Sequence, residues 1–311
     1  MASITSSKEM TYVQLGNSGL KVSRLILGLG SYGNTSWEKW VIGEEEGIKH
    51  IKAAYDAGIQ TFDTSNVYSN GDSERILGKA IKQHNLPRDE IVVMTKLWGV
   101  VMREPGILAP GPEADAAGYV NQYGLSRKHI FESIKHSLER LQLDYVDVFQ
   151  CHRFDYNTPI AETMQALHDV VKAGYARYIG MSSCHAYQFH AMQNYAINNN
   201  LTPFISMQSQ YNLIYREEER EMMPTLKMFG VGMIPWSPLS QGMLSRPYSE
   251  TSLRADTSVL LSKKDIVAPI IGVTTLERLK DTIGAINVTL TDEEIKHLEE
   301  PYVTQSIHGY E

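Results

Sequence analysis

The chain has 311 residues, of which 42% are hydrophobic and 21% charged, and its formal net charge at neutral pH is −7. This length allows one large domain or two small ones, and a core of that size needs no disulfide bonds. The mild acidity argues against nucleic acid or an anionic membrane surface as a partner. The two cysteines, Cys151 and Cys184, are too few for a disulfide framework and suit a reducing compartment.

The two ends of the chain carry no recognisable targeting signal. Residues 1–11 lack the apolar segment of a signal peptide, and we expect them to be flexible. No apolar run approaches the roughly 18–20 residues of a membrane span, and residues 308–311 match no lipidation or peroxisomal signal. The sequence therefore predicts a cytoplasmic protein without a membrane partner, and it does not specify the oligomeric state.

The first predicted element covers residues 12–23. Apolar and polar residues alternate there on both sides of a turn that contains Gly16 and Gly19. Alternation around a glycine-containing turn is typical of a β-hairpin.

Beyond the hairpin, short apolar runs alternate with amphipathic stretches. Runs that are apolar on both faces suit parallel strands covered by helices. Asp144, Gly174 and Gly230 lie where helices give way to strands. The predicted strands are Leu25–Gly28, Thr61–Asp63, Ile91–Thr95, Val146–Gln150, Ala176–Met181, Phe204–Gln208, Gly232–Trp236 and Val267–Gly272, and the predicted helices are 44–57, 73–84, 126–141, 159–173, 186–199, 217–229 and 275–285.

Eight strands with intervening helices indicate an α/β fold, and a closed (β/α)8 barrel more readily than an open sheet. No repeat or linker divides the chain, so we expect a single domain over residues 1–311. Residues 98–124 form a long loop after the third barrel strand, where long loops are usually functional, although a flexible surface insertion is the alternative. Residues 240–266 also depart from the pattern, because only 258–264 look helical there.

Polar residues with a shared chemistry follow three successive barrel strands. Asp63 and Tyr68 follow the second strand, Lys96 follows the third, and His152 follows the fourth. Because the carboxyl ends of barrel strands meet at one face, we expect the four side chains to converge. Reduction of a carbonyl by hydride requires a proton donor, and an ammonium beside a tyrosine hydroxyl makes proton donation easier. Lys96 would supply this ammonium, Asp63 would hold Lys96 in place, and His152 would orient the carbonyl.

Each of these four residues also has a purely structural explanation. Asp63 could cap a helix, Tyr68 could be ordinary packing, Lys96 could be a solvated loop lysine, and His152 could be hydrogen-bonded within the core. Their order at successive strand ends favours the catalytic interpretation.

The stretch from Gly58 to Tyr68 resembles the Gly-x-x-x-x-Asp-x-(Ala/Ser)-x-x-Tyr signature of the aldo-keto reductase superfamily. The segments that contain Lys96 and His152 resemble the lysine and histidine motifs of the same family. The resemblance extends from about Tyr12 to Leu298 and is strongest to fungal members of the aryl-alcohol dehydrogenase and versiconal hemiacetal acetate reductase type. It implies a small-molecule carbonyl substrate, aromatic aldehydes among them, with Tyr68 as the general acid.

The resemblance also implies NADPH or NADP⁺ as the cofactor. Gly30, Ser31 and Tyr32 resemble the loop beside the nicotinamide ribose, and Tyr32 and Trp98 would line the substrate pocket. The family more often has asparagine where this chain has Ser183. Further contacts to the cofactor are implied for Asp63, for Ser182, Ser183 and Gln208 at the carboxamide, for Trp236 stacked on the nicotinamide, and for Ser237, Leu239 and Gln241 at the pyrophosphate.

The segment from Gly272 to Thr282 resembles the part of the family that binds the adenosine phosphate. A helix N-terminus beside an arginine suits a 2′-phosphate, so Thr274 and Arg278 would bind it, with Asp281 and Thr282 near the adenine. Arg278 could instead be an ordinary surface residue. The chain has no Rossmann fingerprint, because the glycines of residues 28–33 have a different spacing.

Relatives of this family carry a longer loop and a full helix before their eighth strand. Here residues 253–257 resemble the beginning of that loop, and residues 258–264 resemble the last turns of the helix, so we predict a truncated seventh barrel helix. A segment this short would leave Ile234, Ile266 and Ile270 uncovered. Weakened stability, a looser cofactor clamp and association through the exposed patch would follow.

Three rival interpretations remain open. Cys151-His152 and Cys184-His185 could in principle hold zinc, but no Cys-x-x-Cys pair is present and His152 already has a role, so we expect no metal. An NADPH-binding module that senses redox state or docks on a partner is the second, and an inactive isoform is the third. Steady oxidation of NADPH in the presence of aldehydes would separate the binding module from an enzyme, and a melting curve would expose an isoform that is prone to misfolding.

Overall fold

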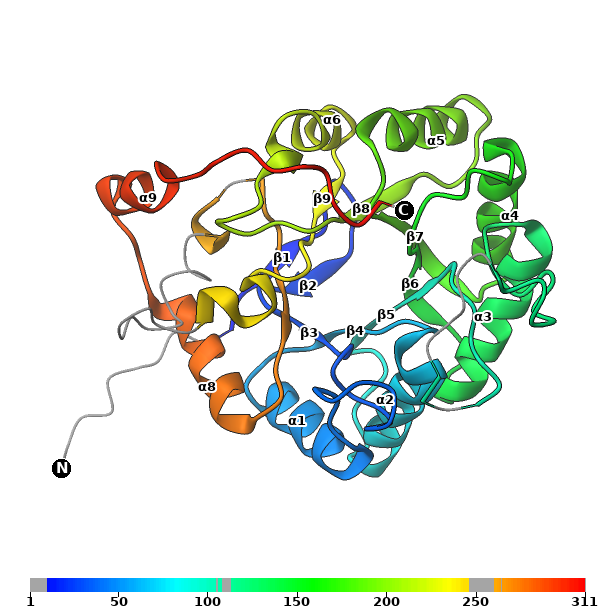
Figure 1. The fold of residues 1–311 in the computed structure, drawn as a ribbon, viewed down its shortest axis with the longest axis horizontal. Coiled ribbons are helices and arrows are strands. Elements are labelled where there is room, and N and C mark those ends of the chain that lie inside the picture. The colour runs from blue at the N-terminus through cyan, green and yellow to red at the C-terminus, as the bar shows by residue number, and fades with distance from the viewer. Residues whose placement is uncertain (1–9, 105, 108–112, 246–259, 264, 311) are drawn as a thin grey trace.

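The computed structural model describes residues 10–104, 106–107, 113–245, 260–263 and 265–310. Eight strands form one parallel sheet in the order β10-β3-β4-β5-β6-β7-β8-β9, and helices surround it (Figure 1). The strands are β3 (Ile26–Gly28), β4 (Thr61–Asp63), β5 (Val92–Leu97), β6 (Val146–Cys151), β7 (Ala176–Ser182), β8 (Phe204–Gln208), β9 (Gly232–Met233) and β10 (Ile270–Gly272).

The helices of the barrel follow the strands in the order that the sequence predicts. Each apolar stripe faces the sheet; in α2, for example, Ile76, Leu77, Ala80 and Ile81 are buried. The α-helices are α1 (Glu44–Asp56), α2 (Asp72–Gln83), α3 (Arg127–Leu141), α4 (Ile160–Lys172), α5 (Ala186–Asn198), α6 (Met222–Phe229), α8 (Leu276–Gly284) and α9 (Asp292–Glu299), and the 3₁₀ turns are η1 (Tyr68–Gly71), η3 (Glu217–Glu219), η4 (Ser240–Ser245) and η5 (Ala285–Asn287).

Two predicted strands are each three residues shorter in the structure than predicted, and β3 is shorter by one residue. The predicted strand Gly232–Trp236 contains Pro235, the predicted strand Val267–Gly272 contains Pro269, and proline has no N–H for a ladder hydrogen bond. The barrel nevertheless closes between them, because the Val267 N–H donates to the Met233 carbonyl at 2.9 Å and the Ile270 N–H donates to the Pro235 carbonyl at 2.8 Å. The (β/α)8 prediction is therefore confirmed.

The helices differ from prediction in two places. The predicted helix 217–229 is divided into η3 and α6, since Pro224 lacks an N–H and fits only in the first turn of a helix. Helix α9 was not predicted, although Thr291 and Glu294 form the capping box that marks its start. Asp144, Gly174 and Gly230 lie between helices and strands, as expected, and the two glycines have positive φ; after α3, the left-handed residue is Gln142.

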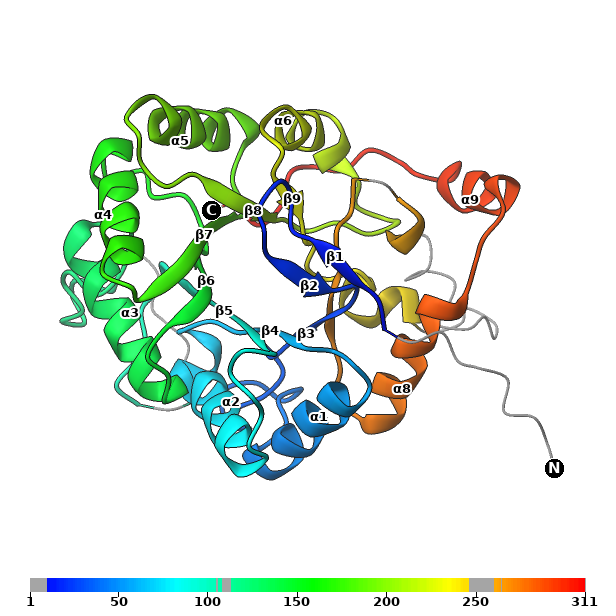
Figure 2. The ribbon, with the colours of Figure 1, turned by 180° about the vertical axis from the view of Figure 1, so that it is seen from behind.

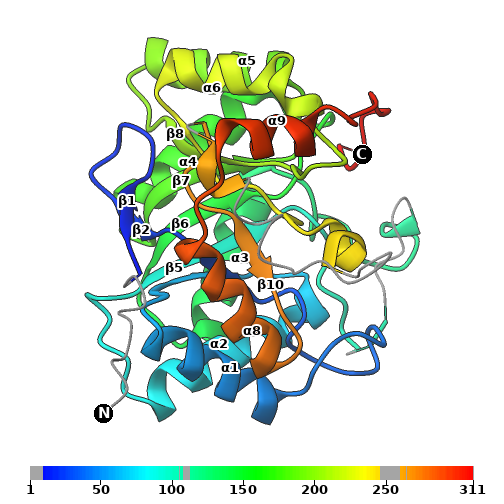
Figure 3. The ribbon, with the colours of Figure 1, turned by 90° about the vertical axis from the view of Figure 1, so that its left-hand side faces the viewer.

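The predicted hairpin is also confirmed. Strands β1 (Tyr12–Gln14) and β2 (Lys21–Ser23) pair antiparallel. They lie across one end of the barrel (Figure 2), at the end opposite the carboxyl terminus (Figure 3). Leu15 and Val22 of the hairpin are fully buried and pack with Ile26, Val92 and other residues inside the barrel. The hairpin therefore closes the amino-terminal end of the barrel with an apolar cluster.

The prediction that Ile234, Ile266 and Ile270 are uncovered is wrong. Their exposed fractions are 0%, 1% and 6%. Ile234 and Ile270 point into the barrel and pack in the cluster that the hairpin closes, so they need no outer helix. Ile266 lies outside the barrel in the main core, as does the buried Leu260.

An arginine holds the connection to the eighth strand against the barrel. The guanidinium of this half-buried residue, Arg24, donates to the carbonyls of Leu261, Ile266 and Val267. Residues 260–262 are helical. Residues 258, 259 and 264 of the predicted helix lie outside the described residues, and so does the whole segment 253–257. The length of the seventh helix thus stays a prediction. In the described part of the chain, no helix combines the length and the apolar character that crossing a bilayer requires.

The apolar cluster at the closed end of the barrel predicts that shortening Leu15 strongly destabilises the fold. Leu15→Ala removes a fully buried side chain and leaves a cavity at the closed end of the barrel. We expect the free energy of unfolding to fall by about 2–5 kcal/mol, measured by urea denaturation. Val13→Ala, on the same hairpin but only partly buried, is the control and should cost less. Equal losses for the two variants would contradict the role of the hairpin as a plug.

Candidate active site

The four predicted catalytic side chains converge at the carboxyl-terminal end of the barrel. Asp63 ends β4 and Lys96 lies in β5, and the Lys96 Nζ is 2.5 Å from the Asp63 Oδ2. The same ammonium donates to the Thr64 carbonyl at 2.9 Å and to the Tyr68 hydroxyl at 3.4 Å. The ammonium thus joins the carboxylate to the phenol, and both Lys96 and Asp63 are buried.

The Tyr68 ring is held by its own turn and by two neighbours. Tyr68 begins η1, in which Ser69 and Asn70 both have left-handed backbone conformations. The ring faces Gly30, where an added Cβ would lie 3.7 Å from it. His152, just beyond β6, meets the ring edge-on with 5.8 Å between centroids. Tyr68, Lys96 and His152 therefore surround one point at the mouth of the barrel.

Burial and neighbouring charges set the protonation states of two of these groups. Burial by itself lowers the pKa of Lys96, but Asp63 and Tyr68 outweigh it and raise the pKa above its ordinary value. Burial, with help from Lys96 and Arg153, holds the pKa of His152 well below its usual range. At neutral pH the site therefore contains an ammonium beside a neutral imidazole.

Two glutamines fix the second oxygen of Asp63. Gln150 in β6 and Gln208 in β8 each donate through Nε2 to the Asp63 Oδ1 at 3.0 Å. Gln208 also donates to the Gln150 Oε1 at 3.1 Å. Gln208 was predicted to contact only the cofactor, and Gln150 was not predicted as a site residue, although it stands two residues before His152 at a strand end.

The residues expected at the nicotinamide lie beside these glutamines. Ser182 ends β7 and Ser183 follows it, and the Ser182 hydroxyl donates to the Gln208 carbonyl at 2.6 Å. The Trp236 indole N–H donates to the Ser183 hydroxyl at 3.1 Å. Trp236 is partly exposed, as a stacking surface requires. The structure thus brings Ser182, Ser183, Gln208 and Trp236 together at one side of the mouth.

The loop after β3 was expected to lie beside the nicotinamide ribose and the substrate, and the structure agrees with this only in part. Gly30 and Ser31 lie at the mouth, since Gly30 contacts Tyr68 and a Cβ on Gly272 would be 3.8 Å from the Ser31 hydroxyl. Tyr32 is fully buried, and its hydroxyl lies 3.3 Å from the His50 Nδ1. Its side chain packs in the core against α1 because the loop turns back toward that helix, so the expectation that Tyr32 lines the substrate pocket is corrected.

The segment expected to bind the adenosine phosphate begins α8. Thr275 caps the helix, and the exposed Arg278 donates from Nη1 to the Thr274 hydroxyl at 3.1 Å. Thr282 is buried, and its hydroxyl donates to the Arg278 carbonyl at 2.8 Å, so this hydroxyl faces the helix backbone. Asp281 lies on the same helix. Arg278 and Thr274 are therefore adjacent at a helix N-terminus, as the sequence analysis expected.

Two remaining groups of predicted residues are placed as follows. Ser237 and Leu239 lie between β9 and η4, and the Ser237 carbonyl accepts a hydrogen bond from the Asn212 side chain at 3.0 Å. The side chain of Gln241 falls outside the described residues. Trp98 begins the long loop after β5. The next residue of this loop, Gly99, approaches Val67, which precedes Tyr68 in the chain.

The carboxyl-terminal tail returns to this mouth. Gly309 lies against the Trp236 ring, where an added Cβ would be 3.6 Å from it. Tyr310 is buried, meets the His185 ring edge-on and donates its hydroxyl to Glu218. Burial raises the pKa of Glu218 to about 7. The tail is thus anchored to an acidic turn next to the expected stacking tryptophan.

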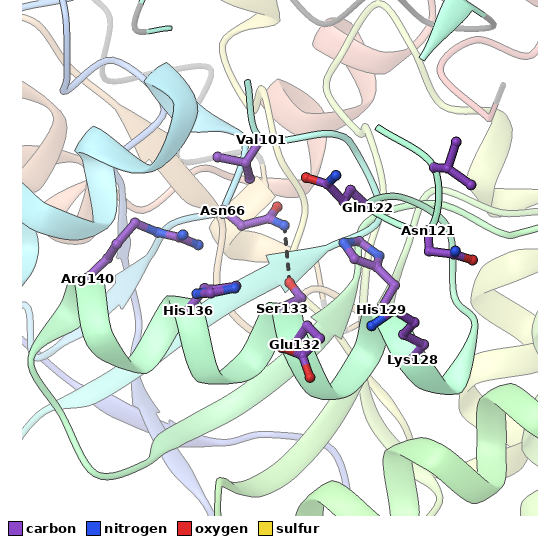
Figure 4. Close-up of a pocket in the computed structure, with 11 residues that line it drawn as sticks. Asn66, Val101, Asn121, Gln122, Lys128, His129, Glu132, Ser133, His136 and Arg140 are labelled. Carbon is purple, nitrogen blue, oxygen red and sulfur yellow. Dashed lines mark hydrogen bonds between the residues drawn. The ribbon is translucent and has the colours of Figure 1, made fainter. Parts of the chain in front are cut away.

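A separate hollow lies outside the barrel, between α3 and the loop after β5 (Figure 4). It has a volume of about 350 Å³, and none of the four catalytic candidates lines it. Asn66, from the turn between Asp63 and Tyr68, reaches its edge. Cys151 and Cys184 are buried free thiols, and no group of three or more metal-binding side chains occurs within the described residues.

Comparison with known proteins identifies the family. A sequence model of the Aldo/keto reductase family matches residues 24–258. The chain is 44% identical to versiconal hemiacetal acetate reductase of Aspergillus parasiticus, over 96% of this chain and 99% of that protein. It is 43% identical to an aldo-keto reductase of Fusarium vanettenii (98% and 94%) and to a putative aryl-alcohol dehydrogenase of Schizosaccharomyces pombe (96% and 97%).

The chain therefore belongs to the aldo-keto reductase family, as its resemblance predicted. Membership indicates an oxidoreductase that reduces small carbonyl compounds with a nicotinamide cofactor. The alignment with the Aspergillus protein extends over 341 positions, more than the 311 residues of this chain, so that relative has residues without a counterpart here. The prediction that they fall before the eighth strand stays a prediction.

The raised pKa of Glu218 predicts a pH-dependent stability. A carboxyl group that binds its proton more tightly in the folded chain contributes stability that is complete below about pH 4.5 and is lost as the pH rises through about 7. Glu218→Gln cannot ionise and still offers Tyr310 an acceptor. We expect its free energy of unfolding, relative to the unmodified chain, to rise by about 2–3 kcal/mol between pH 5 and pH 8.

Thermal and urea unfolding at both pH values would measure this difference. Glu217→Gln on the same turn is a useful comparison, because the pKa of Glu217 is lowered to about 2, chiefly by its hydrogen bond from Tyr302. A relative stability of Glu218→Gln that is the same at pH 5 and pH 8 would contradict the assignment.

Proposed function

We propose that the chain is an NADP(H)-dependent reductase of aldehydes and ketones, aromatic ones included, in which Tyr68 donates the proton. The observation that carries the proposal is the Lys96 ammonium, which contacts both the Asp63 carboxylate at 2.5 Å and the Tyr68 hydroxyl at 3.4 Å. A structural lysine needs no phenol beside it. An ammonium there stabilises the negative charge that forms on the tyrosine oxygen when it gives up its proton.

The residues around the mouth fit a nicotinamide cofactor. Trp236 offers a partly exposed ring, and Ser182, Ser183 and Gln208 surround it. Gln208 directs its amide N–H groups at Asp63 and Gln150, which orients its carbonyl oxygen as an acceptor for a carboxamide N–H. Bound there, the cofactor supplies the hydride.

The protein supplies the positioning and the proton. His152 is neutral and edge-on to Tyr68, so it can donate a hydrogen bond to a carbonyl oxygen without competing for the acidic proton. Tyr68 then protonates the developing alkoxide, and Lys96, held by Asp63, stabilises the phenolate. Trp98 and the loop that it begins supply apolar surface beside Tyr68 for the remainder of the substrate.

Preference for NADPH over NADH is supported by the start of α8. Arg278 and Thr274 lie together at the N-terminus of this helix, where the helix dipole favours an anion. An arginine in this position suits the 2′-phosphate that distinguishes the two cofactors. An NADPH-binding module without turnover is the alternative, and steady NADPH oxidation with a panel of aldehydes and ketones would decide between the two.

Removal of the Tyr68 hydroxyl tests the proton donor. Tyr68→Phe keeps the ring that packs on Gly30, and we expect turnover to fall by about 10²–10⁴-fold, the usual contribution of a general acid. The affinity for NADPH, measured by fluorescence titration, should be retained. Tyr156→Phe, at an exposed position, is the control. Turnover within twofold of the unmodified enzyme would refute the role of Tyr68.

Removal of the Arg278 guanidinium tests the choice of cofactor. Arg278→Ala should weaken binding of NADPH by about 1.5–3 kcal/mol, as expected for a hydrogen bond to a charged group, and leave NADH nearly unchanged. Calorimetric titration with both cofactors measures the effect. Lys280→Ala, exposed on the same helix, controls for a general loss of positive charge. An equal loss of affinity for both cofactors would indicate a structural arginine.

A further inference from the structure

The histidine of the site has a hydrogen-bonding partner that the catalytic proposal leaves without a role. The Ser65 hydroxyl lies 3.2 Å from the His152 Nδ1, and Ser65 is fully buried. In the family signature this position holds alanine or serine, so the hydroxyl is a feature of only some members.

This contact matters because it affects which ring nitrogen of His152 carries the proton. A neutral imidazole carries one N–H, on either Nδ1 or Nε2, and the hydrogen bond at one nitrogen decides which nitrogen holds the proton. In the described residues, the structure gives Nδ1 a partner in Ser65 and gives Nε2 none. If Nδ1 accepts from Ser65, the proton is on Nε2, where it can be donated to a substrate.

Two acceptors compete for the single proton of the Ser65 hydroxyl. The Asn66 Oδ1 is 3.4 Å away, which exceeds the ordinary range for an O–H···O hydrogen bond, whereas the imidazole nitrogen is closer. The orientation of the Asn66 amide is set from the other side, because its Nδ2 donates to the Ser133 hydroxyl of α3 at 3.2 Å (Figure 4). Asn66 therefore presents only an oxygen to Ser65, and the His152 Nδ1 is the nearer acceptor for the Ser65 proton.

We propose that Ser65 is a positioning residue, which donates its hydroxyl proton to the His152 Nδ1 and so holds the imidazole in the tautomer that carries hydrogen on Nε2. This inference rests on the proposed function, since only a carbonyl reductase needs a donor at that nitrogen. It extends the site to a residue that contacts neither the substrate nor the cofactor.

The test of the proposal is the tautomer itself. Histidine-selective ¹⁵N labelling of the full chain distinguishes protonated from unprotonated ring nitrogens, and His152→Asn identifies the signals by their loss. We expect Nδ1 to be unprotonated and Nε2 protonated in the unmodified protein at neutral pH. In Ser65→Ala the proton should be shared between the two nitrogens. A proton fixed on Nδ1 in the unmodified protein would overturn the proposal, whatever the activity.

The kinetic consequences give a second readout. Ser65→Ala should lower kcat/KM by about two- to tenfold, the value of one neutral hydrogen bond. The loss should fall mainly on KM, because a bound carbonyl itself selects the tautomer that donates to it. The pKa of His152 should rise, since Ser65 donates only to the neutral ring. Ser65→Thr keeps a hydroxyl and should restore kcat/KM.

The control is Ser206→Ala. Ser206 is equally buried, on β8, and its hydroxyl makes no hydrogen bond within the described residues. Its loss should change neither the ¹⁵N signals of His152 nor kcat/KM. If the protein holds the Nε2–H tautomer but reduces no carbonyl, the proposed function is contradicted and the role of Ser65 stands. If the ¹⁵N signals and the kinetics of Ser65→Ala are unchanged, the role of Ser65 alone is refuted.

Discussion

The buried ion pair between Asp63 and Lys96 is the interaction on which the arrangement at the barrel mouth depends. A charge in a low-dielectric interior is tolerated only when it is paired and hydrogen-bonded, and removal of one partner of such a pair typically costs about 3–5 kcal/mol. Here Asp63 accepts from Lys96 at one oxygen and from Gln150 and Gln208 at the other. Because these residues come from β4, β5, β6 and β8, the pair constrains four strand ends at once.

One end of the barrel stabilises the fold, and the other end carries the candidate catalytic residues. At the amino-terminal end, the hairpin places Leu15 and Val22 in an apolar cluster. At the opposite end, the strand termini carry buried polar groups that are costly unless each finds a partner. The closed end therefore provides the burial that stabilises the barrel, and this allows the other end to hold an ammonium beside a phenol and a neutral imidazole.

The same division explains how a short connection before β10 is compatible with a closed barrel. The inward-facing Ile234 and Ile270 are covered by the plug from the hairpin and so do not depend on the outer helix. Arg24, which directly follows the hairpin, binds the carbonyls at the end of the connection. The hairpin region thus secures the barrel where β9 and β10, two short strands with Pro235 and Pro269 close by, provide few ladder hydrogen bonds.

The sequence by itself determined the order and type of the elements, because apolar periodicity and turn residues are local signals, and it determined the four catalytic candidates, because strand ends of a barrel must share one face. Only the tertiary structure decided which way individual side chains point. It turned Tyr32 into the core, directed Gln208 at Asp63, placed Gln150 in the same network and set Ser65 against His152. These contacts join residues far apart in the chain, so their geometry depends on the register between strands and on packing, which no local pattern specifies.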